Sequence, residues 1–128
     1  MQQRQNISSG AKWENLVGYS RAVRIGNTIE ISGTTSIDEK GITVGIGAPF
    51  LQTRFILQKI AGVLEQCGAS MKDVIRTRIY TVDISKWEEI GKAHKEFFSD
   101  IKPATSMVEV CKLISPELLV EIEVTAIV

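Results

Sequence analysis

The strict alternation of residues 118–127 constrains the fold of this chain more than any other feature. The even-numbered residues from Leu118 to Ala126 are all apolar, whereas the odd-numbered ones include Glu121 and Glu123. Successive side chains on a β-strand point to opposite faces, so this segment predicts a strand with one buried face. The two carboxylates then share the other face, about 7 Å apart at the usual rise of a strand. Acidic residues in that position need a structural or chemical reason.

A second strand is expected shortly before this one, over residues 106–113. A tight turn around Ser115 and Pro116 would join the two strands, because serine and proline are frequent turn residues. The earlier strand places Glu109 among apolar neighbours on one face. It therefore raises the same question as the carboxylates of the final strand.

Turn signals and periodicity predict the elements nearer the N-terminus. Residues 1–18 are expected to be irregular. Gly26–Asn27 can supply the positive φ of a two-residue turn, so the flanking segments Arg21–Ile25 and Thr28–Ser32 predict a hairpin. The Gly-rich, polar residues 34–47 predict a long loop.

Two helices and one more strand are expected in the middle of the chain. Apolar residues at three- and four-residue steps predict a helix over Phe50–Cys67. Asp73–Asp83 alternates in the manner of a strand. Ser85, with Glu88 three residues later, predicts a capping box that opens the second helix.

The predicted order is β-β-α-β-α-β-β, which indicates a single α+β domain with a mixed sheet. Each helix lies between strands, so right-handed crossovers are expected to pack both helices on one face of the sheet. The other face would still carry apolar side chains from the last two strands. Such a face predicts burial against another copy of the chain.

Composition narrows the class of protein. A length of 128 residues indicates one domain, covering residues 1–128. Lys and Arg number 15, as do Asp and Glu, so no net charge attracts the chain to nucleic acid or to an anionic membrane. No apolar run reaches the ~18 residues of a membrane span, and residues 1–10 lack the apolar stretch of a signal peptide. We therefore expect a cytoplasmic protein with no membrane partner.

The sequence contains no motif for a metal or a nucleotide cofactor, and none is expected. Cys67 and Cys111 form no CxxC and do not cluster with the single histidine, His94, so we interpret them as small buried apolar residues. His94 lies on a helical stripe without an evident partner, which is typical of a core or surface histidine. The segment Gly45–Gly47 does not complete GxGxxG, because Phe50 stands in place of the third glycine.

Two interpretations of Glu121 remain open at this point. It could be a general acid or base that holds a water between subunits. Alternatively, it could pair with a cation on a neighbouring strand. The cations in question are Arg76, Arg78 and Lys112. The same alternatives apply to Glu123 and Glu109, with a structural role favoured for both.

Short motifs along nearly the whole chain resemble the YjgF/RidA family. They are Gly18–Ala22, Ile31–Gly33, Gln52–Thr53, Asp73–Thr77, Phe97–Phe98 and the C-terminal pair Pro103–Val110 and Val120–Glu123. Each motif is weak alone, and their order and spacing carry the likeness. The resemblance implies a YjgF-like (chorismate mutase-like) subunit assembled as a homotrimer around a central barrel. It also implies clefts between subunits that bind small carboxylate-bearing metabolites. In deaminating members these clefts hydrolyse enamines or imines without a metal or organic cofactor.

The resemblance also assigns expected roles to individual residues. Tyr19 matches a pocket tyrosine, Ser32 and Gly33 match the strand end that lines the cleft, and Glu121 matches the glutamate that holds the attacking water. Thr105 departs from the pattern, because the deaminating members carry an arginine there that grips the substrate carboxylate.

The missing arginine changes what the cleft can bind. A charge-assisted hydrogen bond contributes about 1.5–3 kcal/mol, so its loss would weaken carboxylate binding about ten- to a hundred-fold. Threonine cannot replace a planar cation. The protein is therefore expected either to use another cation, Arg21 or Arg78, or to bind something other than a 2-imino acid. Met107 also differs, since many of those members have cysteine there.

Three functional hypotheses follow. In the first, a trimeric cleft hydrolyses a small metabolite: Glu121 orients water and Tyr19 closes one wall. The groups expected to hold the ligand are Thr105, Ser106, Met107, Ser32 and the backbone of Gly33. In the second, the trimer binds a metabolite or a partner protein without turnover. The third, RNA cleavage, is disfavoured because the charge is balanced and no basic-aromatic stripe is present.

Overall fold

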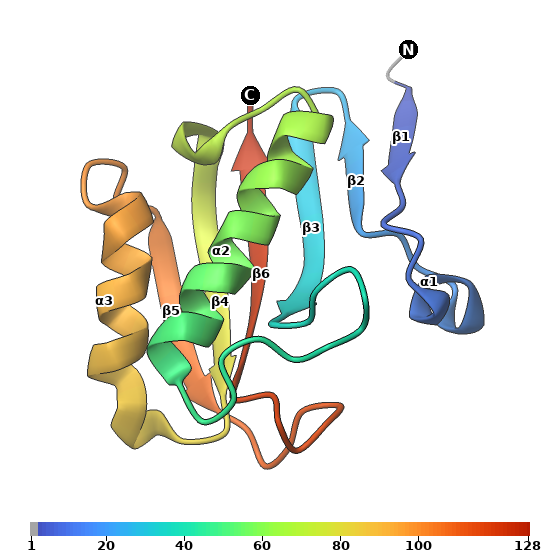
Figure 1. Ribbon diagram of the computed structural model, residues 1–128. Helices are drawn as coiled ribbons and strands as arrows, with labels where there is room; N and C mark the ends of the chain where they lie inside the picture. Colours follow the sequence, from blue (N-terminus) through green and yellow to red (C-terminus); the bar gives the residue numbers. More distant parts are fainter. Residues whose placement is uncertain (1–2) are drawn as a thin grey trace.

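The computed structural model describes residues 3–128, which fold into one six-stranded sheet with its two long helices packed against it (Figure 1). In chain order the elements are β1 (Arg4–Ile7), α1 (Lys12–Val17), β2 (Ala22–Ile25), β3 (Thr28–Thr35), α2 (Pro49–Gln66), β4 (Val74–Thr81), α3 (Trp87–Phe98), β5 (Ala104–Glu109) and β6 (Val120–Ile127). Short 3-10 turns, Met71–Asp73 and Ile84–Lys86, precede β4 and α3. No helix in residues 3–128 has the length and apolar character needed to cross a bilayer.

The sheet order is β1-β2-β3-β6-β4-β5, and only the β4–β5 pair is parallel. The predicted α+β fold with a mixed sheet is therefore confirmed. The predicted joining of the last two strands by a tight turn is wrong, because β4 lies between β5 and β6. A turn does occur, with the Leu118 amide donating to the Ser115 carbonyl at 3.1 Å. It belongs to a longer connection, which carries the chain past β4 so that β6 becomes a central strand.

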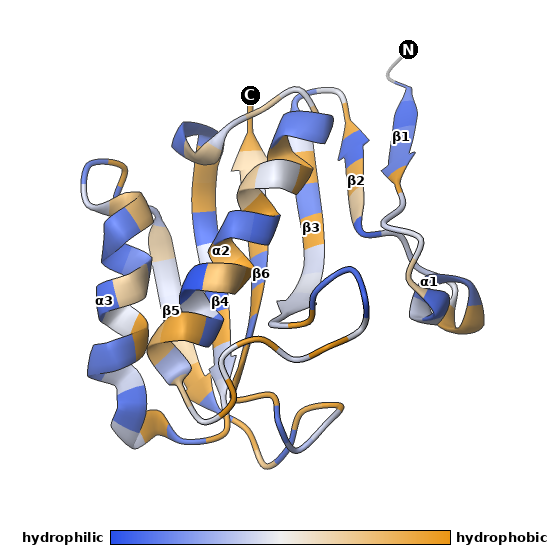
Figure 2. Cartoon of the chain, in the orientation of Figure 1, coloured by the Kyte–Doolittle hydropathy of each residue, from blue (hydrophilic) through white to orange (hydrophobic). Residues whose placement is uncertain are grey.

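Helices α2 and α3 cover one face of the sheet, as expected (Figure 1). The apolar stripe of α2 and the inward side of the strands are buried together, and hydropathy alternates along β3, β4 and β6 (Figure 2). The fully buried side chains at this interface include Ile56, Leu57, Ile60, Leu64, Ile79, Ile122 and Val124. Each aliphatic side chain that is fully buried contributes about 1.5–3 kcal/mol relative to exposure. This core fixes the register of β6 and with it the position of its carboxylates.

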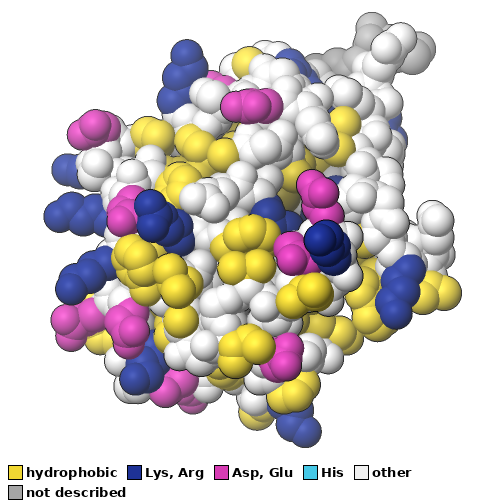
Figure 3. Space-filling view, viewed as in Figure 1, with side chains coloured by type: hydrophobic (Ala, Val, Ile, Leu, Met, Phe, Trp, Pro, Cys, Tyr) yellow, Lys and Arg dark blue, Asp and Glu magenta, His cyan; other side chains and the backbone are white. Residues whose placement is uncertain are grey.

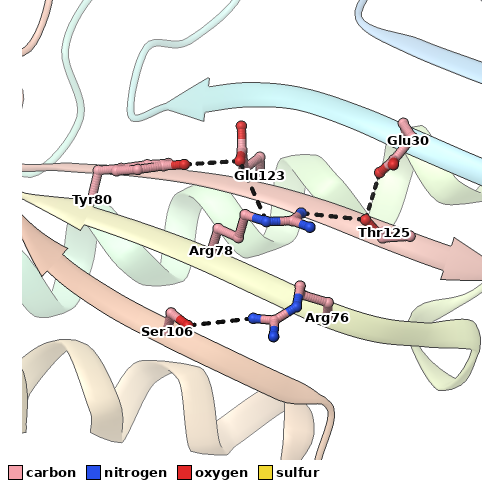
Figure 4. A network of polar contacts seen from close by, with 7 residues as sticks. All are labelled: Glu30, Arg76, Arg78, Tyr80, Ser106, Glu123 and Thr125. Carbon is pink, nitrogen blue, oxygen red and sulfur yellow. Dashed lines mark hydrogen bonds and ion pairs between the residues drawn. The ribbon is translucent and has the colours of Figure 1, made fainter.

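The opposite face of the sheet carries the expected exposed apolar side chains, Val108 in β5 and Ile127 in β6, beside a polar network along β4 and β6. There the Tyr80 hydroxyl donates to Glu123 Oε1 at 2.9 Å, and Arg78 Nε lies 3.8 Å from the same oxygen (Figure 4). Arg78 also donates to the Thr125 hydroxyl at 3.4 Å, and that hydroxyl donates to Glu30. Most apolar residues of these strands turn toward the helices, whereas Ile75 and Ile127 are exposed.

The N-terminal segment is more ordered than predicted. Residues 1–2 lie outside the described part, but β1 pairs with β2 and α1 follows it. Glu14 in α1 is buried and accepts hydrogen bonds from Ser8 and Ser9, which tie the segment down. The short strand was missed because its residues are polar and give no apolar alternation.

Two local details also differ from expectation. The predicted capping box of Ser85 and Glu88 does not form. Instead, the Asp83 carboxylate accepts the Ser85 amide at 3.0 Å, and α3 begins only at Trp87. Cys111 is exposed rather than buried, whereas Cys67 is buried as predicted. Cys111 is exposed because it lies after the end of β5.

Candidate functional site

A cavity of about 700 Å³ opens between the N-terminal segment, the end of β3 and the loop that follows it. The polar groups in its wall include Tyr19, Arg21, Lys59 and Glu121, and the backbone of Gly33. Apolar side chains, among them Trp13 and Ile114, complete the wall. A concave site with few polar groups on apolar walls is typical of small-molecule binding.

A β-bulge in β3 creates the floor of this cavity. Ile31 pairs with Val124 and Thr34 pairs with Ile122, so two residues of β3 oppose one residue of β6. Gly33 lies in the bulge, and a β-carbon there would overlap the carboxylate of Glu121. The absence of a side chain at Gly33 therefore gives the carboxylate its place.

The side chain of Glu121 is half-buried, and its carboxylate has no hydrogen-bond or ion-pair partner among residues 3–128. Burial raises the pKa of its carboxyl group, the Arg21 charge opposes that rise, and Glu123 adds to it. A cross-strand ion pair, the alternative role considered for Glu121, is instead made by Glu123, which contacts Arg78. Glu109 also has a structural partner, the Ile84 amide at 3.0 Å. A partly desolvated carboxylate beside a cavity can hold a water molecule or accept its proton.

Arg21 provides a cation in this cavity whose charge acts on the Glu121 carboxyl group. It retains only 9% of its accessible surface, and one of its terminal amines donates to the Gly33 carbonyl at 2.5 Å. Its Nε is buried without a partner in the described part of the chain. Burial lowers the pKa of the guanidinium, which stays charged because its ordinary value is so high. Of the two cations considered from the sequence, Arg21 lines the cavity, whereas Arg78 lies on the polar face of the sheet.

Lys59 also lines the cavity, although the sequence did not predict it as a site residue. Its Nζ donates to the carbonyls of Thr35 at 2.9 Å and Ile37 at 2.8 Å. Burial, together with the charge of Arg21, lowers the pKa of Lys59 to about 8, and Asp38 opposes this shift. The only sequence signal was a lysine directly before Ile60 in the apolar stripe of α2, which is ordinarily a residue at the border of the buried face.

The predicted site residues fall into separate groups within one chain. Tyr19, Gly33 and Glu121 line the cavity. Ser32 lies behind it, where its hydroxyl donates to the Ser20 carbonyl at 2.7 Å. Thr105, Ser106 and Met107 all lie on β5, at the far edge of the sheet beyond β4 and β6.

The β5 residues have partners of their own. The Thr105 hydroxyl lies 2.6 Å from that of Thr77, which in turn lies 2.9 Å from His94 Nε2. Ser106 accepts a hydrogen bond from Arg76 at 3.3 Å, and Met107 packs against the core. Burial lowers the pKa of His94, so the ring is neutral near pH 7 and serves as a core histidine.

Two further observations bear on the chemistry. The residues described contain no group of three or more His, Cys, Asp or Glu side chains that could hold a metal ion. The helix-covered side of the molecule carries Lys, Arg, Asp and Glu intermingled with hydrophobic side chains (Figure 3). That side therefore has no broad basic surface of the kind that nucleic acids require.

Comparison with known proteins identifies relatives. The family model described as Endoribonuclease L-PSP matches residues 10–128. The chain is 33% identical over 107 residues to 3-aminoacrylate deaminase RutC of Acinetobacter baylyi, covering 84% of each chain. It is 36% identical over 108 residues to the RutC family protein PH0854 of Pyrococcus horikoshii, covering 84% of this chain and 85% of that one.

A solved structure agrees over the whole fold. Rv2704 from Mycobacterium tuberculosis, described as a member of the YjgF/YER057c/UK114 family, superposes with a TM-score of 0.89 at 48% identity. The match covers 98% of this chain and 100% of that one. Family model, sequence relatives and structure all converge, and the chain belongs to the YjgF/RidA family.

Proposed function

We propose that this protein hydrolyses a small enamine or imine in a cleft between the subunits of a homotrimer, without a metal or organic cofactor. The observation that carries the proposal is the Glu121 carboxylate, which is half-buried, unpaired among the described residues and set against Gly33 in the cavity. Burial raises its pKa, which makes it a stronger base toward water. The relative named 3-aminoacrylate deaminase RutC supports this reaction class.

In this proposal each chain contributes one half of the cleft. Tyr19, Gly33 and Glu121 form one wall within a chain. The β5 residues Thr105, Ser106 and Met107 lie at an edge of the sheet and would form the facing wall in a neighbouring copy. A trimer measured by light scattering or sedimentation supports the assembly, and a monomer at working concentration contradicts it.

The decisive test is the pair of variants Glu121→Gln and Glu123→Gln. Removing a general base typically costs 10²- to 10⁴-fold in rate, so Glu121→Gln should lose turnover of freshly generated 2-aminoacrylate or 3-aminoacrylate by about that factor. Glu123→Gln alters the polar face away from the cavity and should retain turnover. Equal rates in wild type and Glu121→Gln, with both proteins folded, would reject the catalytic role.

A second candidate is metabolite binding without turnover. It is favoured by Thr105, which cannot form the bidentate contact that an arginine would make with a carboxylate. Binding of a carboxylate ligand by calorimetry, with no turnover across a panel of imines and enamines, would select this alternative.

A further inference from the structure

Lys59 brings an amine to the same cavity as Glu121, from the middle of helix α2. We propose that this amine is a covalent nucleophile that attacks the carbonyl or imine carbon of a small anionic ligand and forms a Schiff base with it. The inference rests on the proposed function only in that both use this cavity. It assigns the ligand to the class of small 2-oxo or 2-imino acids and gives Lys59 a role distinct from that of Glu121.

The hydrogen bonds of Lys59 fix the direction of its lone pair. A neutral amine carries two N–H groups and one lone pair. The carbonyls of Thr35 and Ile37 accept two hydrogen bonds from Nζ, at 2.9 and 2.8 Å. When the amine is neutral, those two bonds occupy both N–H groups and direct the lone pair away from the carbonyls. The carbonyls themselves are held by the end of β3 and by the bridge between Ile37 and Thr43.

The charges around Lys59 make the neutral amine accessible. Arg21 faces it from the segment before β2 and disfavours the ammonium form, while Asp38 in the loop after β3 favours it. Glu121 faces the same cavity from β6. With the pKa near 8, about a tenth of the amine is neutral at pH 7 and about half at pH 8. Desolvation next to another cation is a recognised way to activate a lysine nucleophile.

The other charged side chains of the cavity wall are exposed to solvent. Lys12, Glu39 and Lys40 line the cavity and are all exposed, so water screens their effect on Lys59. The cation of Arg21, which lines the cavity, suits the carboxylate of the ligand. A carboxylate at Arg21 would place the neighbouring carbon of a 2-oxo or 2-imino acid within the same cavity as the amine.

The reaction balances without any other reagent. With an imine ligand, the Lys59 nitrogen bonds to the imine carbon, the C=N pair moves to the ligand nitrogen, and a proton passes from Lys59 to that nitrogen. The second proton of the neutral Lys59 amine then passes to the same nitrogen, which leaves as ammonia, and the lysine Schiff base forms. Water attacks the Schiff base carbon, Glu121 transfers the two protons of that water in turn to the Lys59 nitrogen, and the C–N bond to Lys59 breaks to release the carbonyl product. The sum is imine plus water giving carbonyl plus ammonia.

The test is reductive trapping of the full-length wild-type protein with pyruvate and sodium borohydride. A Schiff base reduced in place adds one carboxyethyl group, which intact-mass measurement and peptide mapping should locate on Lys59. The yield should rise several-fold between pH 6 and pH 9, with a midpoint near the pKa of Lys59, which is about 8. Labelling that is spread over exposed lysines and spares Lys59 would overturn the proposal.

Two lysine-to-arginine variants test whether the adduct forms on the Lys59 amine. Lys59→Arg keeps a cation that can donate to Thr35 and Ile37 but cannot form a Schiff base, so it should lose the adduct. Lys92→Arg changes an exposed lysine of α3 outside the cavity, and should label as wild type. Unchanged labelling of Lys59→Arg would count against the assignment, and mapping the wild type needs no variant to fold.

The outcome is separable from that for Glu121. If Glu121→Gln stops turnover while wild type gives no Lys59 adduct and Lys59→Arg turns over normally, the proposed function stands and the Schiff base is rejected. If Lys59 is trapped while Glu121→Gln turns over at the wild-type rate, the Schiff base stands and the role of Glu121 is rejected.

Discussion

Glu121 and Glu123 lie two residues apart on the same face of β6, yet their surroundings differ in kind. Glu123 contacts Tyr80 and Arg78 in a network that runs across three strands (Figure 4). Glu121 has no such partner among the described residues and lies against Gly33 at a cavity. The carboxylates are chemically identical, so the difference comes from the strands beside them. A paired carboxylate stabilises the fold locally, and an unpaired one is available to a ligand.

The largest effect is expected on the other side of the same strand. Ile122 lies between the two glutamates in sequence, points into the core and is fully buried. Ile122→Ala should lower the free energy of unfolding by about 2–5 kcal/mol, because it removes buried methyl groups and leaves a cavity. Urea denaturation measures the change. If Ile122→Ala lowered the free energy of unfolding by less than Glu121→Gln or Glu123→Gln does, the division of β6 into a buried structural face and a polar face would be contradicted.

The next effect tests whether the bulge positions Glu121. Gly33→Ala puts a β-carbon where the carboxylate now lies, so the carboxylate must move. We expect about a 10²-fold loss of turnover, the usual consequence of misplacing a catalytic group by about 1 Å. The matched control is Gly62→Ala, an exposed site in α2 with open space around it. That control should be stabilised by about 0.5–1 kcal/mol, since alanine favours the helix. Equal turnover in both variants would show that Gly33 does not place the carboxylate.

A smaller effect is expected from the hydrogen bond that Glu123 accepts from Tyr80. Tyr80→Phe removes the hydroxyl that donates to Glu123 at 2.9 Å. The free energy of unfolding should fall by about 0.5–1.5 kcal/mol, the net contribution of one hydrogen bond, with turnover unchanged. A fall in turnover comparable to that of Glu121→Gln would mean that the two carboxylates act as one site.

The smallest effect is a pH dependence of stability. Burial raises the pKa of Glu121 in the folded protein above its ordinary 4.5. The folded state therefore holds this proton more tightly, and the resulting stability is present below pH 4.5 and lost as the pH rises through the folded pKa. Glu121→Gln has no such loss, so its thermal stability relative to wild type should improve between pH 4 and pH 7. A constant difference across that range would show that the carboxylate is fully solvated.

Local patterns predicted much of this fold. The Gly26–Asn27 turn, the stripe of α2 and the alternation of β6 all lie where the sequence places them. Each depends on neighbours in sequence, through turn geometry or side-chain period. The pairing of β5 and β6 was wrong, because alternation identifies a strand but not its neighbour in the sheet. Nothing in residues 103–128 encodes that β4 lies between the two.

The site was only partly predictable for the same reason. Sequence placed Glu121 and Glu123 on one face but could not separate them, since the separation depends on a bulge in β3. Lys59 was not predicted because a lysine beside an apolar stripe is ordinarily at the solvent border, and its partners are carbonyls at the end of β3 and in the loop after it. The His94–Thr77–Thr105 contacts likewise join three separate elements.

The central position of β6 has a consequence for synthesis of the protein. Of the six strands of this sheet, the last in chain order, β6, is the one that joins β3 to β4. Until residues 120–127 emerge, the nascent chain has two separate strand groups and an uncovered apolar helix, a state prone to aggregation. A stop codon at position 120, which removes this strand, should yield insoluble protein, whereas a stop codon at position 128 should not.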